Sequence, residues 1–238
     1  MSPASARPSA PTILIIGASR GLGHAMAAEF LKKGWNVVGT VRAGSRTRLH
    51  DLAEEHEGRV EIETLDINEQ DQIAALRNRL SGRVLDMLFV NAGITTHDEH
   101  VHIGAVTTEE FMRVMITNAL SPMRAIEALQ DLVPAQGLIG AMSSGQGSIA
   151  NNETGRREVY RGSKAALNMF MRSFAARQPG TPRAMVLMAP GWVRTDLGGP
   201  EARLSIEESV PNLVNVLVSN LGTPGLRYLD YLGRTVPW

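Results

Sequence analysis

The chain contains no cysteine, carries no excess of either charge and has no long apolar run. The lack of cysteine excludes a disulfide-stabilised scaffold and a thiolate nucleophile, and leaves only histidine and carboxylate side chains as zinc ligands. The 24 basic and 24 acidic side chains balance, which argues against nucleic-acid binding, because nucleic-acid-binding proteins are normally basic. The longest uncharged stretch, residues 132–152, is broken by Gly, Ser, Gln and Asn, so we expect no membrane-spanning helix.

The remaining composition is that of a soluble globular protein. Its 238 residues, 43% hydrophobic and 20% charged, suffice for one domain with a full core. Residues 1–11 are rich in Ser, Ala and Pro and lack an apolar centre, so we interpret them as a disordered leader rather than a secretory signal. We expect residues 12–238 to form a single domain, and the protein to be cytoplasmic.

Short apolar runs alternate with helical patterns along the rest of the chain. Strands are predicted at residues 12–16, 36–41, 60–65, 85–90, 138–142, 183–188 and 226–231, and helices at residues 24–33, 47–56, 69–80, 107–132, 159–178 and 206–220. Pro122 is expected to bend the longest helical segment. This alternation predicts an α/β fold of Rossmann type, a doubly wound parallel sheet with helices on both faces.

The first predicted strand runs directly into a glycine-rich turn, Gly17-Ala-Ser-Arg-Gly21-Leu-Gly23. Glycines let the chain turn tightly and approach a pyrophosphate, and the N-terminus of the next helix offers free N–H groups. Taken alone, these glycines could equally serve packing. Placed between a strand and a helix, they predict a dinucleotide-binding site.

The end of the second predicted strand indicates which dinucleotide binds. NAD sites usually carry a carboxylate there for the ribose 2′-OH, whereas this strand is followed by Arg42. Arg42 and Arg20 together suit a 2′-phosphate, which guanidinium groups bind in a bidentate manner, and Arg46 and Arg48 could assist. We therefore favour NADP(H) over NAD(H); the alternative is that these arginines are simply solvated.

Polar residues also follow the third and fourth predicted strands. Asp66 could accept a hydrogen bond from the adenine amino group, and Asn91-Ala92-Gly93 lies at the carboxyl edge of the sheet, where ligands bind in such folds. Loop capping explains each of them equally well without the other motifs.

The most specific feature is Tyr160-Arg-Gly-Ser-Lys164. Residues four apart share one helix face, so an ammonium group lies near a phenol, and a nearby cation lowers a phenol pKa. The chain has three tyrosines and only three lysines, so about 0.04 such pairs are expected by chance. Lysine, unlike arginine, can release a proton, which indicates acid–base chemistry.

Three further polar residues are candidates for the same chemistry. Ser143 and Ser144 close a predicted strand, where a hydroxyl could hold a substrate carbonyl oxygen beside Tyr160. Asn118 lies within a helical stretch, where Asn is unfavourable, and its amide could bind a water that connects Lys164 to solvent. A capping serine and a solvated asparagine are the alternatives.

The strand predicted at residues 183–188 is followed by Ala189-Pro-Gly-Trp-Val-Arg-Thr-Asp196. Pro190-Gly191 ends the strand and turns the chain over the mouth of the pocket. The backbone near Val193 and the Thr195 side chain could then bind a carboxamide.

In this order, the motifs resemble the single-domain branch of the short-chain dehydrogenase/reductase family over about residues 12–238. Within that family the chain is most similar to C-factor-like and sniffer-like carbonyl reductases. The resemblance rests on residues 143–149, 160–168, 190–196, 198–200 and 230–238.

The resemblance assigns a role to each motif. It implies the catalytic residues Asn118, Ser144, Tyr160 and Lys164. It implies the cofactor-binding residues Gly17, Ser19, Arg20, Gly21, Leu22, Gly23, Arg42, Asp66, Ile67, Asn91, Ala92, Gly93, Tyr160, Lys164, Pro190, Gly191, Val193 and Thr195. Ser144 is chosen over Ser143 because the second serine of such a pair usually holds the role.

The resemblance implies an NADP-dependent oxidoreductase that reversibly reduces a ketone or aldehyde to an alcohol. A 3-oxoacyl-thioester reductase and a non-catalytic NADP(H)-binding sensor or developmental signalling protein are the alternatives. The expected partner is a small carbonyl or alcohol substrate, and the resemblance leaves monomer, homodimer and homotetramer open.

Two segments depart from the pattern or stand outside it. Ser144 and Tyr160 are sixteen residues apart, more than the commonest family spacing, and we expect residues 151–158 to form a loop at the pocket rim. His97, His100 and His102 lie close together, but we expect a solvated loop near the substrate mouth rather than a metal site.

Overall fold

All seven strands form one parallel sheet in the computed structural model, which describes residues 10–238. The strands are β1 (Thr12–Ile16), β2 (Asn36–Val41), β3 (Val60–Thr64), β4 (Met87–Val90), β5 (Leu138–Met142), β6 (Ala184–Ala189) and β7 (Gly225–Asp230). Their order across the sheet is β3-β2-β1-β4-β5-β6-β7. The chain winds outward in both directions from the β1–β4 pair, so a crevice opens there at the carboxyl ends of the strands. The predicted doubly wound parallel sheet is confirmed.

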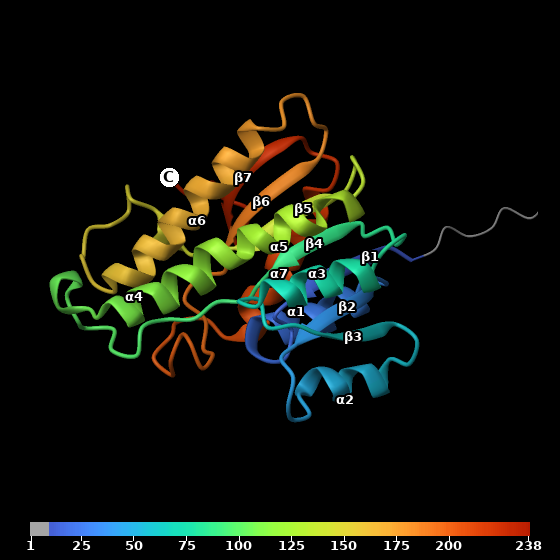
Figure 1. Ribbon diagram of the computed structural model, residues 1–238, viewed down its shortest axis with the longest axis horizontal. Coiled ribbons are helices and arrows are strands. Elements are labelled where there is room, and N and C mark those ends of the chain that lie inside the picture. The colour runs from blue at the N-terminus through green and yellow to red at the C-terminus, as the bar shows by residue number, and fades with distance from the viewer. Residues whose placement is uncertain (1–9) are drawn as a thin grey trace, which may run out of the picture.

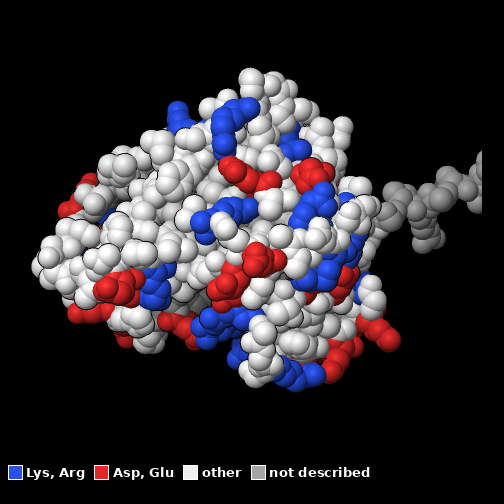
Figure 2. Space-filling view, in the orientation of Figure 1, with Lys and Arg blue, Asp and Glu red and all other residues white. Residues whose placement is uncertain are grey.

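Helices cover both faces of this sheet (Figure 1). On one face pack α1 (Gly21–Lys32), α2 (Arg48–Glu55) and α7 (Ile206–Ser219), and on the other α3 (Gln70–Arg79), α4 (Thr108–Met115), α5 (Ser121–Leu129) and α6 (Glu158–Ala176). None of the helices within residues 10–238 combines the length and apolar character needed to cross a membrane. Basic and acidic side chains alternate over the face shown in Figure 2.

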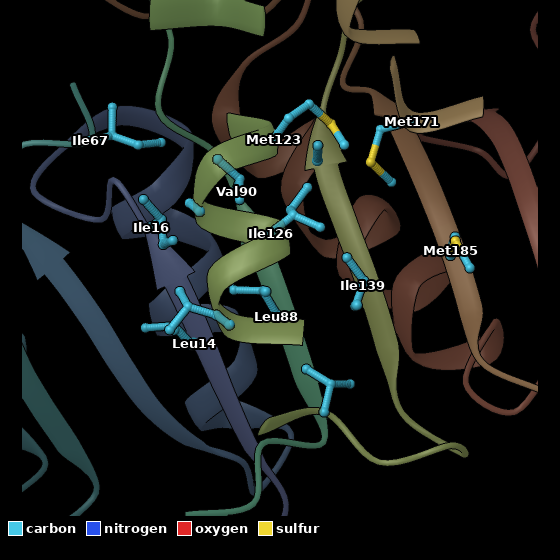
Figure 3. Close-up of a cluster of buried hydrophobic side chains, with 14 of the residues drawn as sticks. Leu14, Ile16, Ile67, Leu88, Val90, Met123, Ile126, Ile139, Met171 and Met185 are labelled. Carbon is cyan, nitrogen blue, oxygen red and sulfur yellow. The ribbon is translucent and has the colours of Figure 1, made fainter. Parts of the chain in front are cut away.

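The alternation of side chains in β1 explains why its apolar run is continuous. Ile13 and Ile15 pack beneath α1 and α7, whereas Leu14 and Ile16 point to the opposite side, against α5. Figure 3 shows part of this second cluster, in which Leu14 and Ile16 lie on the same side of the sheet as Ile126 of α5. Each such side chain contributes about 1.5–3 kcal/mol on burial, and a strand covered on both faces has no polar position.

The segment predicted as one long helix is divided by a π-helical turn, Ile116–Leu120, between α4 and α5. Pro122 lies in the first turn of α5. In an α-helix its ring would clash with the carbonyl of Asn118, four residues back, and it has no N–H to offer that carbonyl. The wider turn before Pro122 relieves this conflict, and such turns are frequent at functional sites.

The predicted leader falls mainly outside the described part of the chain, which begins at residue 10. Its last residue, Pro11, already belongs to the fold, because its carbonyl accepts a hydrogen bond of 2.8 Å from the Asn36 N–H.

Candidate active site

A cavity of about 1050 Å³ lies at the carboxyl ends of the strands. It is lined by the predicted residues Gly17, Ser19, Arg20, Gly21, Leu22, Arg42, Asp66, Ile67, Asn91, Ala92, Gly93, Ser144, Tyr160, Lys164, Pro190, Gly191, Val193 and Thr195. Gly23 and Asn118 lie behind its wall, in contact with Gly17 and Ile94. Residues from six strand ends therefore meet at one place.

The glycine turn is packed so closely that side chains would not fit. Gly17 has φ +90°, and a Cβ there would stand 2.9 Å from the backbone of Ala92; a Cβ on Gly23 would stand 2.0 Å from the Gly17 carbonyl oxygen. The Asn91 amide donates to that same oxygen at 2.7 Å, which joins the turn to β4. Packing of the turn against β4 thus requires glycine at both positions.

The N-terminus of α1 opens into the cavity beyond this turn. Arg20 occupies the capping position without a side-chain cap bond, and the first turn contains no acidic residue. The first N–H groups of a helix lack intrahelical partners and carry the positive end of its dipole. This end of the cavity suits a phosphate or pyrophosphate group.

Two of the predicted arginines line the phosphate end, and a third does not. Arg20 and Arg42 line the cavity, and Arg20 lies 3.2 Å from Asp196 across its mouth, with both side chains largely exposed. Such an exposed pair is weak, so the Arg20 guanidinium is available to an anion. Arg46 instead binds Asp51 and Glu54 in a surface cluster.

Asp66 caps its loop and also faces the cavity. It lines the cavity, and one carboxylate oxygen accepts a hydrogen bond of 3.0 Å from the Asn68 N–H. Its backbone N–H donates to Gln72 at 2.7 Å, which ties the end of β3 to α3.

Tyr160 and Lys164 lie on the buried face of α6, with 6% and 3% of their surfaces exposed. The Lys164 ammonium donates to the Met142 carbonyl at 2.8 Å and lies 5.9 Å from the centre of the Tyr160 ring. Burial lowers the pKa of Lys164 to about 8, so this group exchanges protons near neutral pH.

The expected lowering of the Tyr160 pKa by Lys164 is wrong for this geometry. Burial raises the pKa of Tyr160, while a hydrogen bond with Ser144 and the charge of Arg157 lower it in part. The reason is that desolvation disfavours the phenolate and that the Lys164 ammonium is directed to Met142. Of the two cations near the ring, Arg157 is the nearer, and its charge lowers the pKa of Tyr160 in part.

The two serines after β5 point in different directions. Ser143 is buried, and its hydroxyl donates to Asn168 at 2.6 Å. The Ser144 hydroxyl accepts from the Gln146 N–H at 3.1 Å, and Ser144 lines the cavity together with Tyr160. Of the two, Ser144 is placed to meet a group bound beside Tyr160.

Asn118 is fully buried, and its amide is already engaged. It accepts from the Ile94 N–H and donates to the Ile94 carbonyl, each at 2.8 Å, and it donates to Ser163 at 3.0 Å. Both amide N–H groups are thus occupied, while the amide oxygen keeps one free lone pair. That this amide binds a water stays a prediction. The backbone carbonyl of Asn118 is better suited, because Pro122 cannot supply the helical N–H that would otherwise pair with it.

The segment after β6 forms the far wall of the cavity. Gly191 has φ +84°, and a Cβ there would stand 2.5 Å from the Leu204 side chain. The Thr195 hydroxyl donates to the Val193 carbonyl at 3.3 Å and accepts from the Gly198 N–H at 3.1 Å. These contacts fix the loop whose backbone faces the cavity.

In the loop that contains His97, His100 and His102, two of the histidines each contact a different carboxylate. His97 Nδ1 lies 3.0 Å from Glu110, and His102 Nδ1 lies 3.2 Å from Glu158. Residues 10–238 contain no group of three or more His, Asp or Glu side chains arranged to hold a metal ion.

Two residues of this site escaped the sequence analysis. The Tyr228 hydroxyl, from β7, donates to the Ser144 backbone carbonyl; no local motif signals it, because 84 residues separate the pair. Arg157 lies 4.7 Å above the Tyr160 ring. No helical spacing signals it, because Arg157 precedes α6 and has a left-handed backbone conformation.

Comparison with known proteins agrees with this geometry. Residues 11–203 match the family model for short chain dehydrogenases. A structure from Burkholderia multivorans with bound NADP, classed as a short-chain dehydrogenase/reductase, shares 69% identity with a TM-score of 0.95, over 96% of this chain and 100% of that one. A carbonyl reductase from Pseudomonas aeruginosa in complex with NADP shares 35% identity with a TM-score of 0.89, over 97% and 100%.

A relative in Myxococcus xanthus, C-signal, is 35% identical over 156 residues, which is 65% of this chain and 93% of that protein. These matches confirm the family resemblance found in the sequence. The chain therefore belongs to the short-chain dehydrogenase family.

Proposed function

We propose that this protein is an NADPH-dependent reductase of ketones or aldehydes, with Tyr160 as the proton donor. The single observation that carries the proposal is the meeting of Tyr160, Ser144 and Lys164 at one end of a cavity whose other end is a glycine turn and an open helix N-terminus. The carbonyl reductase from P. aeruginosa, which shares the fold over its whole length, supports the same reaction class.

The residues of the cavity fit a nicotinamide dinucleotide phosphate. Gly17 and Gly21 line the cavity with backbone alone, and the N–H groups of α1 would bind the pyrophosphate. Arg42 and Arg20 would bind the 2′-phosphate, since no carboxylate follows β2 to bind a 2′-OH. The bound NADP in two of the similar structures supports this choice.

When bound, the cofactor supplies the hydride for the carbonyl carbon, or accepts it in the reverse direction. Ser144 would hold the carbonyl oxygen, and Tyr160 would donate its phenolic proton to that oxygen as negative charge develops there. Both side chains line the same cavity, and Ser144 contributes to lowering the Tyr160 pKa, so one oxygen atom could contact both.

The proton lost by Tyr160 has to be replaced from solvent. Lys164, with a pKa of about 8, can give and take a proton at neutral pH. A Cβ on Gly93 would stand 3.3 Å from the Lys164 ammonium and 3.4 Å from the Asn118 amide oxygen, so the glycine keeps the space between them open. A water bound to the Asn118 carbonyl would complete the path.

The test is cofactor consumption with a panel of aldehydes, ketones, diketones and 3-oxoacyl thioesters, comparing NADPH with NADH. We expect NADPH-dependent reduction of at least one aldehyde or ketone. Reduction confined to the thioesters would favour a 3-oxoacyl-thioester reductase. Tight NADPH binding with no reduction of any compound would contradict the proposal and favour a non-catalytic sensor.

A further inference from the structure

Arg157 has an unusual backbone conformation at the start of α6. It is the one non-glycine residue within residues 10–238 with a positive φ, at φ 59° and ψ 43°. The left-handed region costs a residue with a Cβ about 1–2 kcal/mol. Such a conformation persists only where surrounding contacts hold it, and these residues cluster at functional sites.

The side chain of Arg157 is held by Glu99 and Thr95 and is directed at Tyr160. Its Nη2 lies 2.6 Å from the Glu99 carboxylate and donates to the Thr95 hydroxyl at 3.1 Å. Its guanidinium carbon lies 4.7 Å from the centre of the Tyr160 ring. Only 15% of the side chain is exposed, and the buried Nε has no hydrogen-bond partner.

The unpartnered Nε fits a guanidinium packed on an aromatic ring. A buried N–H without an acceptor is unfavourable, but the negatively polarised face of the ring attracts a cation, by about 2 kcal/mol where water is excluded. The contacts with Glu99 and Thr95 fix the guanidinium over the ring. The strained backbone, the buried charge and the missing acceptor thus have one common explanation, which is contact with Tyr160.

We infer that Arg157 is a positioning residue for Tyr160. Its guanidinium fixes the orientation of the phenol and favours the phenolate form, and Glu99 sets how much of the positive charge acts on the ring. The role in turnover rests on the proposed function, whereas the effect on Tyr160 itself does not.

The charged groups around Tyr160 support this assignment. Arg157 and Lys164 face it from α6, Glu99 from the loop after β4, and the Tyr228 hydroxyl from β7, while His97 and Arg113 line the same cavity. Among them, Arg157 lowers the pKa of Tyr160 and Glu99 raises it. His97 and Arg113 both contact Glu110, whose carboxylate offsets the Arg113 charge.

Removing the Arg157 charge and removing the Glu99 charge should shift the Tyr160 titration in opposite directions, and this result distinguishes an electrostatic role from a structural one. The chain has three tyrosines, so phenol signals of isotope-labelled protein can be followed by NMR against pH, with Tyr160→Phe assigning the relevant one. Arg157→Met removes the charge at similar length, and we expect the titration to move to higher pH. Glu99→Gln keeps a hydrogen-bond acceptor without the charge, and we expect a move to lower pH.

Two more variants separate charge from structure. Arg157→Lys restores a cation and should return the titration toward wild type, whereas Arg156→Met, at an exposed neighbouring arginine, should leave it unchanged. If Arg157 has a purely structural role, the Tyr160 titration should shift in the same direction in Arg157→Met and Glu99→Gln, or in neither variant. Either result would overturn the inference.

Turnover provides the second readout. With a substrate of the wild-type enzyme, Arg157→Met should lower kcat/KM at neutral pH by about tenfold, and its pH profile should move in the same direction as the titration. If the Tyr160 titration shifts in opposite directions in the two variants but the protein reduces no carbonyl compound, the inference about Arg157 is supported and the proposed function is contradicted. Normal kcat/KM in Arg157→Met would overturn the role in turnover.

Discussion

The two ends of the cavity are built on different physical principles. At the phosphate end, the determinants are steric: the glycines at positions 17 and 23 leave no room for a Cβ, and backbone N–H groups provide the binding site. At the reaction end, the determinants are side chains that are buried against their solvation preferences, such as Lys164 with its pKa near 8 and Arg157 with its strained backbone. The comparison indicates that a side chain added to the glycine turn should cost stability, whereas removing the Ser144 hydroxyl or the Lys164 ammonium should cost rate, and removing the ammonium should even gain stability.

The largest effect is expected from Gly23→Ala. A Cβ there would lie 2.0 Å from the Gly17 carbonyl oxygen, so backbone has to move, and we expect a loss of about 4 kcal/mol or more in the free energy of unfolding. Denaturant unfolding measures it. Gly162→Ala is the matched control, because its Cβ position on α6 is open and alanine should stabilise the helix by about 0.5–1 kcal/mol. Equal stability of the two variants would refute the steric account.

Ser144→Ala should lower kcat by about 10²–10³-fold, or roughly 3–4 kcal/mol, because it removes a hydrogen-bond donor from the oxygen that develops charge. The unfolding free energy should change little. Ser143→Ala is the contrasting variant, since its hydroxyl is bonded to Asn168 inside the fold; there we expect loss of stability by about 1–3 kcal/mol with a smaller effect on kcat. The reverse pattern would exchange the roles of the two serines.

Lys164→Met should stabilise the protein at pH 7 while reducing turnover. Burial depresses the folded-state pKa of Lys164 from 10.5 to about 8, so below pH 8 the buried ammonium is a penalty of about 3 kcal/mol. As pH rises from 8 to 10.5, the unfolded chain binds more protons than the folded one, and wild-type stability should rise. Lys164→Met should lack this rise.

Unfolding at several pH values between 7 and 11 measures the effect. Lys32→Met, at an exposed lysine, is the control and should change stability by at most about 0.5 kcal/mol. A Lys164→Met variant less stable than wild type at pH 7 would show that the bond to Met142 outweighs the cost of burying the charge.

The smallest effect is expected at the phosphate end, from Arg42→Ala. Loss of one charge-assisted contact to a 2′-phosphate should weaken NADPH binding by about 2 kcal/mol, or roughly 30-fold, and leave NADH binding nearly unchanged. Fluorescence titration with both cofactors measures it, with Arg46→Ala as the control because Arg46 is bound to Asp51 and Glu54. Equal weakening of both cofactors would contradict the 2′-phosphate assignment.

The phosphate end could be predicted from the sequence, and much of the reaction end could not. The glycine turn directly follows strand β1, and Arg42 directly follows strand β2. Their positions therefore follow from the alternation of strands and helices. Tyr160 and Lys164 share one helix turn and were found for the same reason. In contrast, Tyr228 reaches the site from a segment far away in the chain, and no local pattern marks it.

The sequence also does not reveal the hydrogen-bond partners of Lys164 and Asn118, for a physical reason. The spacing of Tyr160 and Lys164 predicts their proximity, but it does not reveal that the ammonium bonds to Met142 or that burial dominates the phenol pKa. Likewise, the sequence marks Asn118 as unusual, but it does not show that Ile94 occupies the amide. Proximity follows from local structure, whereas hydrogen-bond partners follow from tertiary packing.

Tyr160→Phe tests the central claim most directly, because it removes the proposed proton donor and leaves the ring and the cavity wall in place. NADPH affinity and the rate of carbonyl reduction should be measured on the same sample. The account predicts NADPH binding close to wild type and a loss of at least about 10²-fold in kcat. A variant that binds NADPH and reduces the substrate at nearly the wild-type rate would contradict it.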